Sequence, residues 1–406
     1  MTRAFVRGAC PGLSLPMETG DGLLVRLMPA APIRLDAFIE LCRAARKYGN
    51  GTIEISARGS VQIRGLSPSS APLFAAAVAA LEIDICESVP VISDPLPDDP
   101  AALVDTAAIS AVLRRGLSES ALQLAPKVSV IIDGGGLIDL DRLFADIRLQ
   151  AVRTPEGLKF KLALAGNADS ATPLGVVACD KAAETVLDLL TRIAAHGPAA
   201  RAADLLAMLS PPATRANAPR ARRADTVGIH ALKNGALALG VALAFGHTQA
   251  ESLAALARFA ESNGATWTRP APGRALLVGP FGETGAAKTK DAGTNLGFVT
   301  QASDPRRRIA ACPGAPLCAQ GLIAARTLAA EIARHVTLPP GDGIALHVSG
   351  CAKGCAHPVP APLTIVGTEA GCGIVREDTA RAKPCEYVRE SELIPALTSK
   401  REVAHA

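Results

Sequence analysis

The chain has 406 residues, a length that is large for one hydrophobic core and predicts two or more domains. Hydrophobic residues make up 49% and charged residues 20%, which excludes wholesale disorder. A net charge of +4 and an aromatic content of 3% give no case for nucleic-acid binding. No apolar run reaches the length that spans a bilayer, and the first residues lack the apolar core of a signal peptide. We therefore expect a cytoplasmic protein that binds neither nucleic acid nor membrane.

The first segment of the chain predicts a strand–helix–strand unit. A strand is expected at 22–27, an amphipathic helix at 35–48 and an alternating strand at 51–55. The longest apolar run, 71–81, is about half the length of a membrane span and predicts a core helix.

The middle of the chain predicts a larger α/β segment that begins after a Pro/Asp-rich stretch at 94–100 and ends in a Pro-, Ala- and Arg-rich linker at 210–223. Its expected elements are strands at 127–133, 158–164 and 174–178, and a helix at 182–196.

A second unit then repeats the order of the first, before a Gly-rich break at 282–291. Its expected elements are a strand at 234–239, a helix at 250–261, and strands at 264–268 and 275–279. The repeat predicts an α+β fold in which a small unit and a larger α/β segment each occur twice. The predicted domains are 1–88, 89–224, 225–282 and 283–406.

Four of the ten cysteines form two close pairs in the last quarter of the chain. Five residues separate Cys312 from Cys318, and three separate Cys351 from Cys355. Four thiolates can hold a [4Fe–4S] cluster, one on each iron, and small neighbouring residues let backbone N–H groups approach the sulfur atoms. Buried free thiols, a structural zinc ion and disulfides are the alternatives, although zinc prefers tighter spacings and the cytosol disfavours disulfides.

The pattern C-x5-C followed by G-C-x3-C resembles the cluster signature of the sirohaem-dependent nitrite and sulfite reductase superfamily. The resemblance implies a pseudo-twofold fold of two ferredoxin-like units and two larger α/β segments. It also implies that Cys355 bridges the cluster to the sirohaem iron. An R-x-x-x-Q strand of that superfamily matches Arg58 and Gln62, which implies contacts with a tetrapyrrole. Arg26 matches an arginine that helps to hold the anionic substrate.

The chain departs from the reductases where they bind their oxyanion. Their R-N-V segment corresponds to 89–93, which contains no arginine. Of their K-x-K pair, Lys127 is present, but Ser129 stands in place of the second lysine. Reduction of an oxyanion needs several cations to hold charge and deliver protons, so the departures weaken that assignment.

One branch of the superfamily, the precorrin-3B synthases of aerobic cobalamin biosynthesis, lacks that oxyanion chemistry. The chain resembles this branch at 7–12, 16–17 and 20–23, and in the Asp133-Gly134-Gly135-Gly136 turn. The resemblance implies an O2-dependent monooxygenase that hydroxylates precorrin-3A at C20 and forms a lactone with the ring A acetate. It further implies a mononuclear iron beside the [4Fe–4S] cluster, with electrons from an external ferredoxin or NAD(P)H reductase.

Two other functions stay open. One is a sirohaem-dependent nitrite or sulfite reductase with an altered pocket, and the other is a tetrapyrrole-binding or electron-carrier protein without catalysis. No histidine pattern identifies a ligand for a mononuclear iron. The basic cluster Arg306, Arg307 and Arg308 could bind substrate carboxylates or form a solvated turn. The Asp133 turn could hold an anion on its backbone N–H groups.

Overall fold

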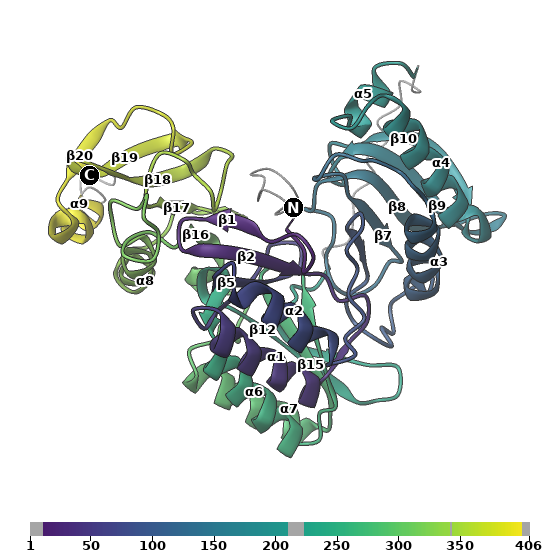
Figure 1. Ribbon diagram of the computed structural model, residues 1–406, viewed down its shortest axis with the longest axis horizontal. Helices are drawn as coiled ribbons and strands as arrows, with labels where there is room; N and C mark the ends of the chain where they lie inside the picture. The colour runs from purple at the N-terminus through teal and green to yellow at the C-terminus, as the bar shows by residue number, and fades with distance from the viewer. Residues whose placement is uncertain (1–10, 210–222, 342, 400–406) are drawn as a thin grey trace.

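The computed structural model describes residues 11–209, 223–341 and 343–399. The motif residues 7–10, with Cys10, and most of the expected linker, 210–222, lie outside the described residues. Figure 1 shows a central body with one α/β body on each side of it, and the two α/β bodies do not meet.

The first central sheet belongs mainly to the N-terminal unit. Its strand order is β1 (Met17–Thr19), β2 (Gly22–Leu27), β5 (Val61–Leu66), β4 (Thr52–Ile55) and β13 (His247–Gln249). Helices α1 (Leu35–Tyr48) and α2 (Ser70–Ala79) cover one face of this sheet. The expected strand at 22–27 and helix at 35–48 are confirmed at their bounds.

The second central sheet repeats this plan. Its strand order is β11 (Gly228–Ala231), β12 (Leu237–Ala242), β15 (Ala275–Phe281), β14 (Trp267–Ala271) and β3 (Ile33–Arg34). Helices α6 (Ala250–Ser262) and α7 (Glu283–Asn295) pack on it. The predicted range 283–406 therefore begins on a helix of the central body.

The two units exchange one short strand each. β13, from the second unit, pairs with β4 of the first sheet, and β3, from the first unit, pairs with β14 of the second. Each exchanged strand runs directly into the first helix of its own unit, β3 into α1 and β13 into α6. Neither sheet is complete without the other half of the chain.

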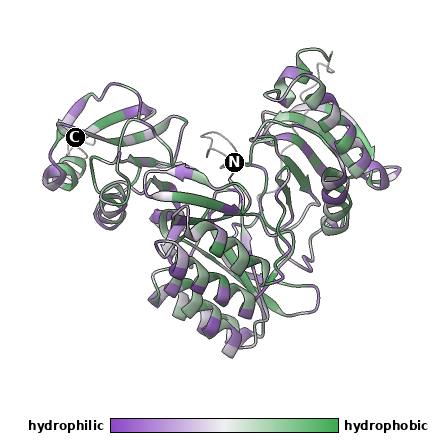
Figure 2. Cartoon of the chain, in the orientation of Figure 1, coloured by the Kyte–Doolittle hydropathy of each residue, from purple (hydrophilic) through white to green (hydrophobic). Residues whose placement is uncertain are grey.

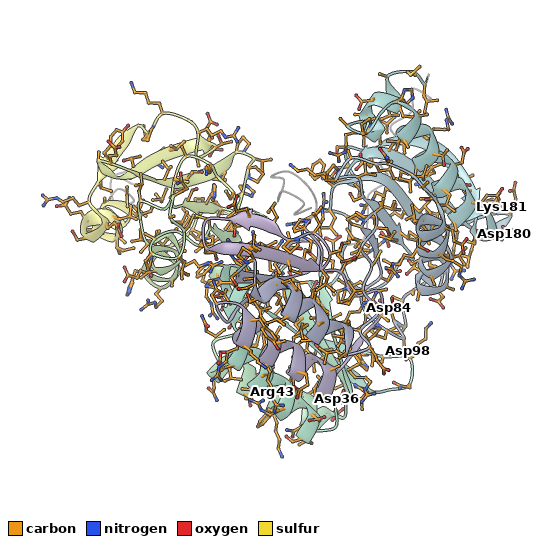
Figure 3. All side chains as sticks on the ribbon, in the orientation of Figure 1. Asp36, Arg43, Asp84, Asp98, Asp180 and Lys181 are labelled. Carbon is orange, nitrogen blue, oxygen red and sulfur yellow. The ribbon has the colours of Figure 1, made fainter. Side chains whose placement is uncertain are left out.

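One hydrophobic core joins the two units. It contains Phe38 and Leu41 of α1 together with Leu253 and Leu256 of α6. In α1 the buried residues recur at helical spacing on one side, as an amphipathic helix requires. Figure 2 shows hydrophilic residues on the outer sides of these helices, and in Figure 3 the labelled Asp36 and Arg43 of α1 lie at that surface.

The two flanking bodies have one topology. The first sheet is β6 (Val91–Ser93), β7 (Val130–Asp133), β8 (Ala145–Thr154), β9 (Gly157–Gly166) and β10 (Thr172–Ala178), with α3 (Thr106–Glu119), α4 (Ala182–Ala195) and α5 (Ala202–Leu206). The second is β16 (Ile309–Ala311), β17 (Leu346–Ser349), β18 (Ala361–Thr368), β19 (Gly371–Asp378) and β20 (Glu386–Val388), with α8 (Ala325–His335) and α9 (Leu393–Ser399). In both, the first three strands are parallel and the last two antiparallel, and one helix joins the first two strands.

Four short 3-10 helices complete the described chain: Cys179–Lys181, Ala244–Gly246, Pro305–Arg308 and Glu390–Glu392. Among the described residues no helix is both long and apolar enough to cross a membrane. The predicted duplicated α+β fold is confirmed.

Phe38 tests whether the shared core holds the two units together. Its ring is fully buried between α1 and the rest of the core, so Phe38→Ala leaves a cavity and should lower the free energy of unfolding by roughly 3–5 kcal/mol. Urea denaturation followed by circular dichroism measures this. Leu73→Ala, at an exposed position of α2, is the control and should change stability by less than about 0.5 kcal/mol. Equal effects of the two changes would contradict the shared core.

Candidate active site

The four predicted cluster cysteines lie on two loops at one edge of the second flanking sheet. Cys312 follows β16 directly and Cys351 follows β17 after Gly350. Because β16 and β17 are parallel neighbours, their carboxyl ends lie at the same edge, and the loops that follow them meet there. The Gly350 N–H donates to Cys312 Sγ at 3.0 Å. All four thiols are free, and Cys355 is the exposed one.

Glycines give the cysteine loops their space. A Cβ on Gly20, in the β1–β2 turn, would stand 2.9 Å from Cys318 Sγ, and a Cβ on Gly350 would stand 2.9 Å from the Gly314 Cα. Burial, and then the neighbouring thiols Cys312 and Cys351, raise the pKa of Cys355. The four sulfur atoms are thus close enough to repel one another as thiolates.

This donor set fits an iron–sulfur cluster. A cluster spreads its four ligands over four irons, whereas a single ion needs its ligands to converge. In the described part of the chain, no three His, Cys, Asp or Glu side chains converge closely enough to hold one metal ion. Ligation by these cysteines therefore stays a prediction, and so does any ligand of a mononuclear iron.

A pocket of about 380 Å³ lies between the central body and the first flanking body. Its volume is within the range typical of small-molecule sites. Five cationic side chains line it: Arg26 of β2, Arg58 of the β4–β5 turn, Arg114 of α3, Lys127 before β7 and Arg269 of β14. No Asp or Glu occurs among the described residues of its lining. Such a pocket suits a ligand with several negative charges.

The structure brings three of the four predicted tetrapyrrole-binding residues together in this pocket, namely Arg26, Arg58 and Lys127. Arg58 also donates to the Phe144 carbonyl at 2.9 Å and so connects the central body to the first flanking body. Gln62, the fourth, stands beside the pocket, directly across from Arg26 on β5.

A row of polar side chains leads from the pocket toward the cysteines. Arg26, Gln62, Glu54 and His247 stand opposite one another on β2, β5, β4 and β13. They occupy the sheet face away from the helices, since the alternate residues belong to the core. With the amide of Gln62 turned so that its oxygen faces Arg26, the orientation that satisfies both neighbours, it accepts from Arg26 at 3.1 and 3.2 Å and donates to Glu54 at 3.1 Å.

Glu54 continues this row into the second flanking body. Its carboxylate pairs with Arg326 of α8 and, at 3.3 Å, with Arg64 of β5. Burial lowers the pKa of Arg326, while Glu54 and the Cys312 thiol act in the opposite direction. Four hydrogen-bonded side chains, Arg26, Gln62, Glu54 and Arg326, therefore lead from the pocket to the start of α8, the helix that follows the first cysteine loop.

The segment 89–93 and Ser129 are the two places where the sequence departs from the reductases, and the structure shows where each lies relative to the pocket. Pro90, Val91, Ile92 and Ser93 line the pocket, so the segment without an arginine forms part of its wall. Ser129 is fully buried and is absent from the described lining, although Lys127 is present there. The pocket thus lacks the cations that the reductases place at these two positions.

Sequence reasoning missed Arg114, Arg269, Glu54 and Arg326. Arg114 lies on a helix that was not expected, and Arg269 and Glu54 are single charged residues in strands, a pattern common at solvated sheet faces. Sheet register places Arg269 and Glu54, and the packing of α3 and α8 places Arg114 and Arg326.

The basic cluster proves to be structural. Arg306 bonds Asp304 and the Gly297 carbonyl, Arg307 forms two bonds with Asp225 at 2.6 and 2.7 Å, and Arg308 donates to the Pro339 carbonyl at 2.7 Å. All three guanidinium groups are thus committed within the chain.

Among the histidines, His230 bonds the Thr226 carbonyl at 3.0 Å and is structural. His347 on β17 is fully buried, and neither ring nitrogen has a partner among the described residues. Burial, then the nearby His357, lower the pKa of His347 to about 4, and Arg274 acts in the same direction.

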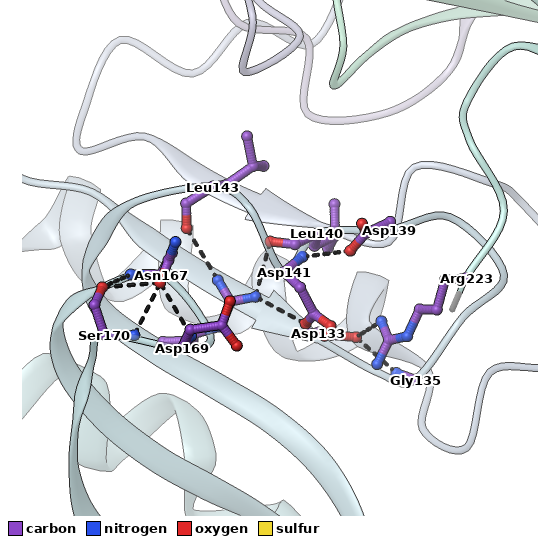
Figure 4. A network of polar contacts seen from close by, with 11 residues as sticks. Asp133, Gly135, Asp139, Leu140, Asp141, Leu143, Asn167, Asp169, Ser170 and Arg223 are labelled. Carbon is purple, nitrogen blue, oxygen red and sulfur yellow. Dashed lines mark hydrogen bonds and ion pairs between the residues drawn. The ribbon is translucent and has the colours of Figure 1, made fainter. Parts of the chain in front are cut away.

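In the Asp133 turn, the chain's own carboxylates accept from backbone N–H groups that could otherwise bind an anion. The Gly134 N–H donates to Asp94 at 2.8 Å, and the Leu137 N–H donates to Asp99 at 2.7 Å. Asp133 bonds the Gly135 N–H and pairs with Arg223 at 2.7 Å (Figure 4). The chain's own carboxylates therefore fill the turn.

This turn is the counterpart of the cysteine loops. Asp94 follows β6 as Cys312 follows β16, and the Gly134 N–H meets Asp94 as the Gly350 N–H meets Cys312. The first half of the molecule thus has carboxylates where the second half has thiols.

Comparison with known proteins identifies the class of fold to which this chain belongs. A model described as the nitrite/sulfite reductase ferredoxin-like half domain matches residues 15–81. The structure superposes on that of the Mycobacterium tuberculosis NirA protein with a TM-score of 0.70 and 20% identity, over 92% of this chain and 79% of that one. The fold is therefore that of the nitrite and sulfite reductase superfamily.

Sequence relatives narrow the class. Sulfite reductase (ferredoxin) 1 of Mycolicibacterium paratuberculosis is 28% identical over 149 residues, 35% of this chain and 27% of the relative. The Precorrin-3B synthase of a Sinorhizobium species is 38% identical over 400 residues, 96% of this chain and 87% of the relative. The chain belongs to the precorrin-3B synthase family.

Asp94, beside the Asp133 turn, should make the free energy of unfolding depend on pH. Burial, then the Asp133 charge, raise the pKa of Asp94 to about 6. A carboxyl whose pKa is raised on folding destabilises the folded state wherever it is ionised in the unfolded chain, so this cost is absent well below pH 3.8, grows between pH 3.8 and about 6, and is complete above about pH 6. Asp94→Asn removes the cost, and an amide oxygen can still accept from Thr106 and Gly134.

Asp94→Asn should therefore raise the free energy of unfolding at pH 8 by on the order of 1–3 kcal/mol, with a much smaller gain at pH 4.5. Urea denaturation at both pH values measures the difference. Asp98→Asn, at an exposed position, is the control. A loss of stability at pH 8 for the Asp94 variant would contradict the assignment.

Proposed function

We propose that the protein is an O2-dependent monooxygenase that hydroxylates precorrin-3A at C20 and closes a lactone with the ring A acetate. The observation that carries the proposal is the pocket lined by five cationic side chains and no described carboxylate. Membership of the precorrin-3B synthase family supplies the substrate class.

The charge of the pocket suits such a substrate. A precorrin carries acetate and propionate arms around its ring, and guanidinium groups bind carboxylates through paired hydrogen bonds. Arg26, Arg58 and Lys127 reach the pocket from three different elements, so they can hold arms on different sides of a ring. Several fixed contacts of this kind orient one carbon of the macrocycle for reaction.

The reaction adds one atom of O2 to the macrocycle and reduces the other to water. It therefore consumes two electrons and two protons. In our proposal Cys312, Cys318, Cys351 and Cys355 hold a [4Fe–4S] cluster, which when bound transfers single electrons. An external ferredoxin or NAD(P)H reductase supplies them. The family resemblance also implies a mononuclear iron, to which we assign no ligand.

The chain's own residues divide the remaining work. The pocket cations hold the carboxylate arms, and Gln62 fixes the direction of Arg26. Glu54 fixes Arg326, which places a positive charge near Cys312. A cation near an iron–sulfur cluster favours its reduced state, because reduction adds negative charge.

A sirohaem-dependent nitrite or sulfite reductase is the second candidate, favoured by the shared fold. Its oxyanion chemistry needs cations that are missing at 89–93 and at Ser129. A non-catalytic tetrapyrrole carrier is the third, and tight macrocycle binding without turnover would distinguish it.

Labelled oxygen tests the proposal. The reduced protein with its cluster reconstituted is incubated with precorrin-3A under 18O2, and the product is analysed by mass spectrometry. We expect one 18O atom in the product and none when 18O is supplied as water. A product without added 18O would overturn the monooxygenase assignment.

Cys318→Ser tests the cluster. Three thiolates and a hydroxyl hold an iron–sulfur cube poorly, so the variant should lose most of the cluster's EPR signal after reduction. Cys385→Ser, which changes an exposed cysteine outside the set, is the control and should keep the signal. A full signal in Cys318→Ser would remove that residue from the ligand set.

A further inference from the structure

Arg269 and Glu54 occupy equivalent positions in the two repeated units. Gln249 precedes α6 and pairs with Thr52, and Arg34 precedes α1 and pairs with Trp267. Glu54 and Arg269 each stand two residues beyond these partners, on β4 and β14. The two sheets therefore carry opposite charges at equivalent positions.

The two positions differ in their partners. Glu54 is held by Arg326, Arg64 and Gln62. Arg269 forms no hydrogen bond or ion pair with any described residue, and its side chain lines the cationic pocket. Arg269 is half-buried, and a partly desolvated cation without a partner costs free energy, which a bound anion would recover.

The charges around Arg269 further destabilise its unpaired guanidinium. Burial, then the charge of Arg114, lower the pKa of Arg269 to about 10, and only Asp94 acts in the opposite direction. Asp94 and Arg269 form no ion pair in the described chain, and the two hydrogen bonds that Asp94 accepts, from Thr106 and Gly134, go to its Oδ2.

Arg114, the neighbouring arginine of the pocket, is already hydrogen-bonded to the backbone. Its guanidinium donates to the Val91 carbonyl at 3.0 Å and to the Ala30 carbonyl at 3.3 Å, so it supports the wall that residues 90–93 form. Arg269 belongs to the second unit and lines the pocket. Its guanidinium has no hydrogen-bond or ion-pair partner among the described residues.

We propose that Arg269 binds a carboxylate arm of the tetrapyrrole substrate, and that it supplies from the second repeat the cation that is missing at 89–93. This inference rests on the proposed function, because it requires a polycarboxylate macrocycle in the pocket. It adds that each half of the chain contributes a carboxylate-binding arginine to one site, Arg58 from the first unit and Arg269 from the second.

Binding of a stable probe separates this inference from the reaction itself. Uroporphyrin III carries acetate and propionate arms, and its octamethyl ester carries none of the charges. Their affinities for the full-length protein are measured by porphyrin fluorescence at several salt concentrations. The variants are Arg269→Gln, Arg269→Lys and the control Arg192→Gln, which changes an exposed residue of α4.

We expect Arg269→Gln to weaken uroporphyrin binding by about tenfold to a hundredfold, as the loss of a hydrogen-bonded charge pair does. Arg269→Lys should recover part of the affinity, Arg192→Gln should bind as the wild type does, and the ester should bind weakly to all. The salt dependence should fall in Arg269→Gln alone, a result that a purely structural role would not give.

Two results would overturn the inference in different ways. Wild-type affinity in Arg269→Gln, with the ester still rejected, would remove Arg269 from the site and leave the proposed function standing. Failure of the wild-type protein to bind uroporphyrin would overturn the tetrapyrrole assignment and this inference with it.

Discussion

The exchange of one short strand between the two repeats determines much of the rest of the structure. β3 completes the second sheet and β13 completes the first, so neither unit can form its full sheet alone. The helices that follow these strands then pack against each other in one core. This arrangement fixes β14 beside the N-terminal segment, and that is why Arg269 shares a pocket with Arg26 and Arg58. The site is thus a consequence of how the halves are joined.

Duplication also explains why the two flanking bodies differ in chemistry but not in fold. Each has a turn after its first strand whose leading side chain accepts a hydrogen bond from a glycine N–H after its second strand. In the second body this acceptor is Cys312, beside three further thiols, and in the first it is Asp94, beside Asp99 and Asp133. The polar row through Glu54 connects the cysteine side to the cationic pocket. Charge distribution, rather than backbone geometry, separates the two bodies.

Sequence periodicity predicted α1 well, because its buried residues recur at helical spacing, and the apolar run of β2 predicted a buried strand. Spacing identified the paired cysteines, and the family motifs led to Arg26, Arg58 and Lys127, which the structure gathers in one pocket. Arg269 and Glu54 could not be predicted in this way. Their importance depends on strand register and on contacts between residues far apart in the chain, such as Glu54 with Arg326. Anion binding was a possibility for the Asp133 turn, but Asp94 accepts from the Gly134 N–H and Asp99 from the Leu137 N–H, which no local pattern reveals.

In our proposal the macrocycle is the substrate of this pocket and not its resident cofactor. The visible absorption spectrum of the purified, cluster-containing protein distinguishes these two roles. We predict the broad absorption of an iron–sulfur cluster alone, with strong tetrapyrrole bands appearing only when precorrin-3A is added and changing as it is converted. Intense sirohaem bands in the protein as purified, unchanged by precorrin-3A, would contradict the claim and favour a reductase.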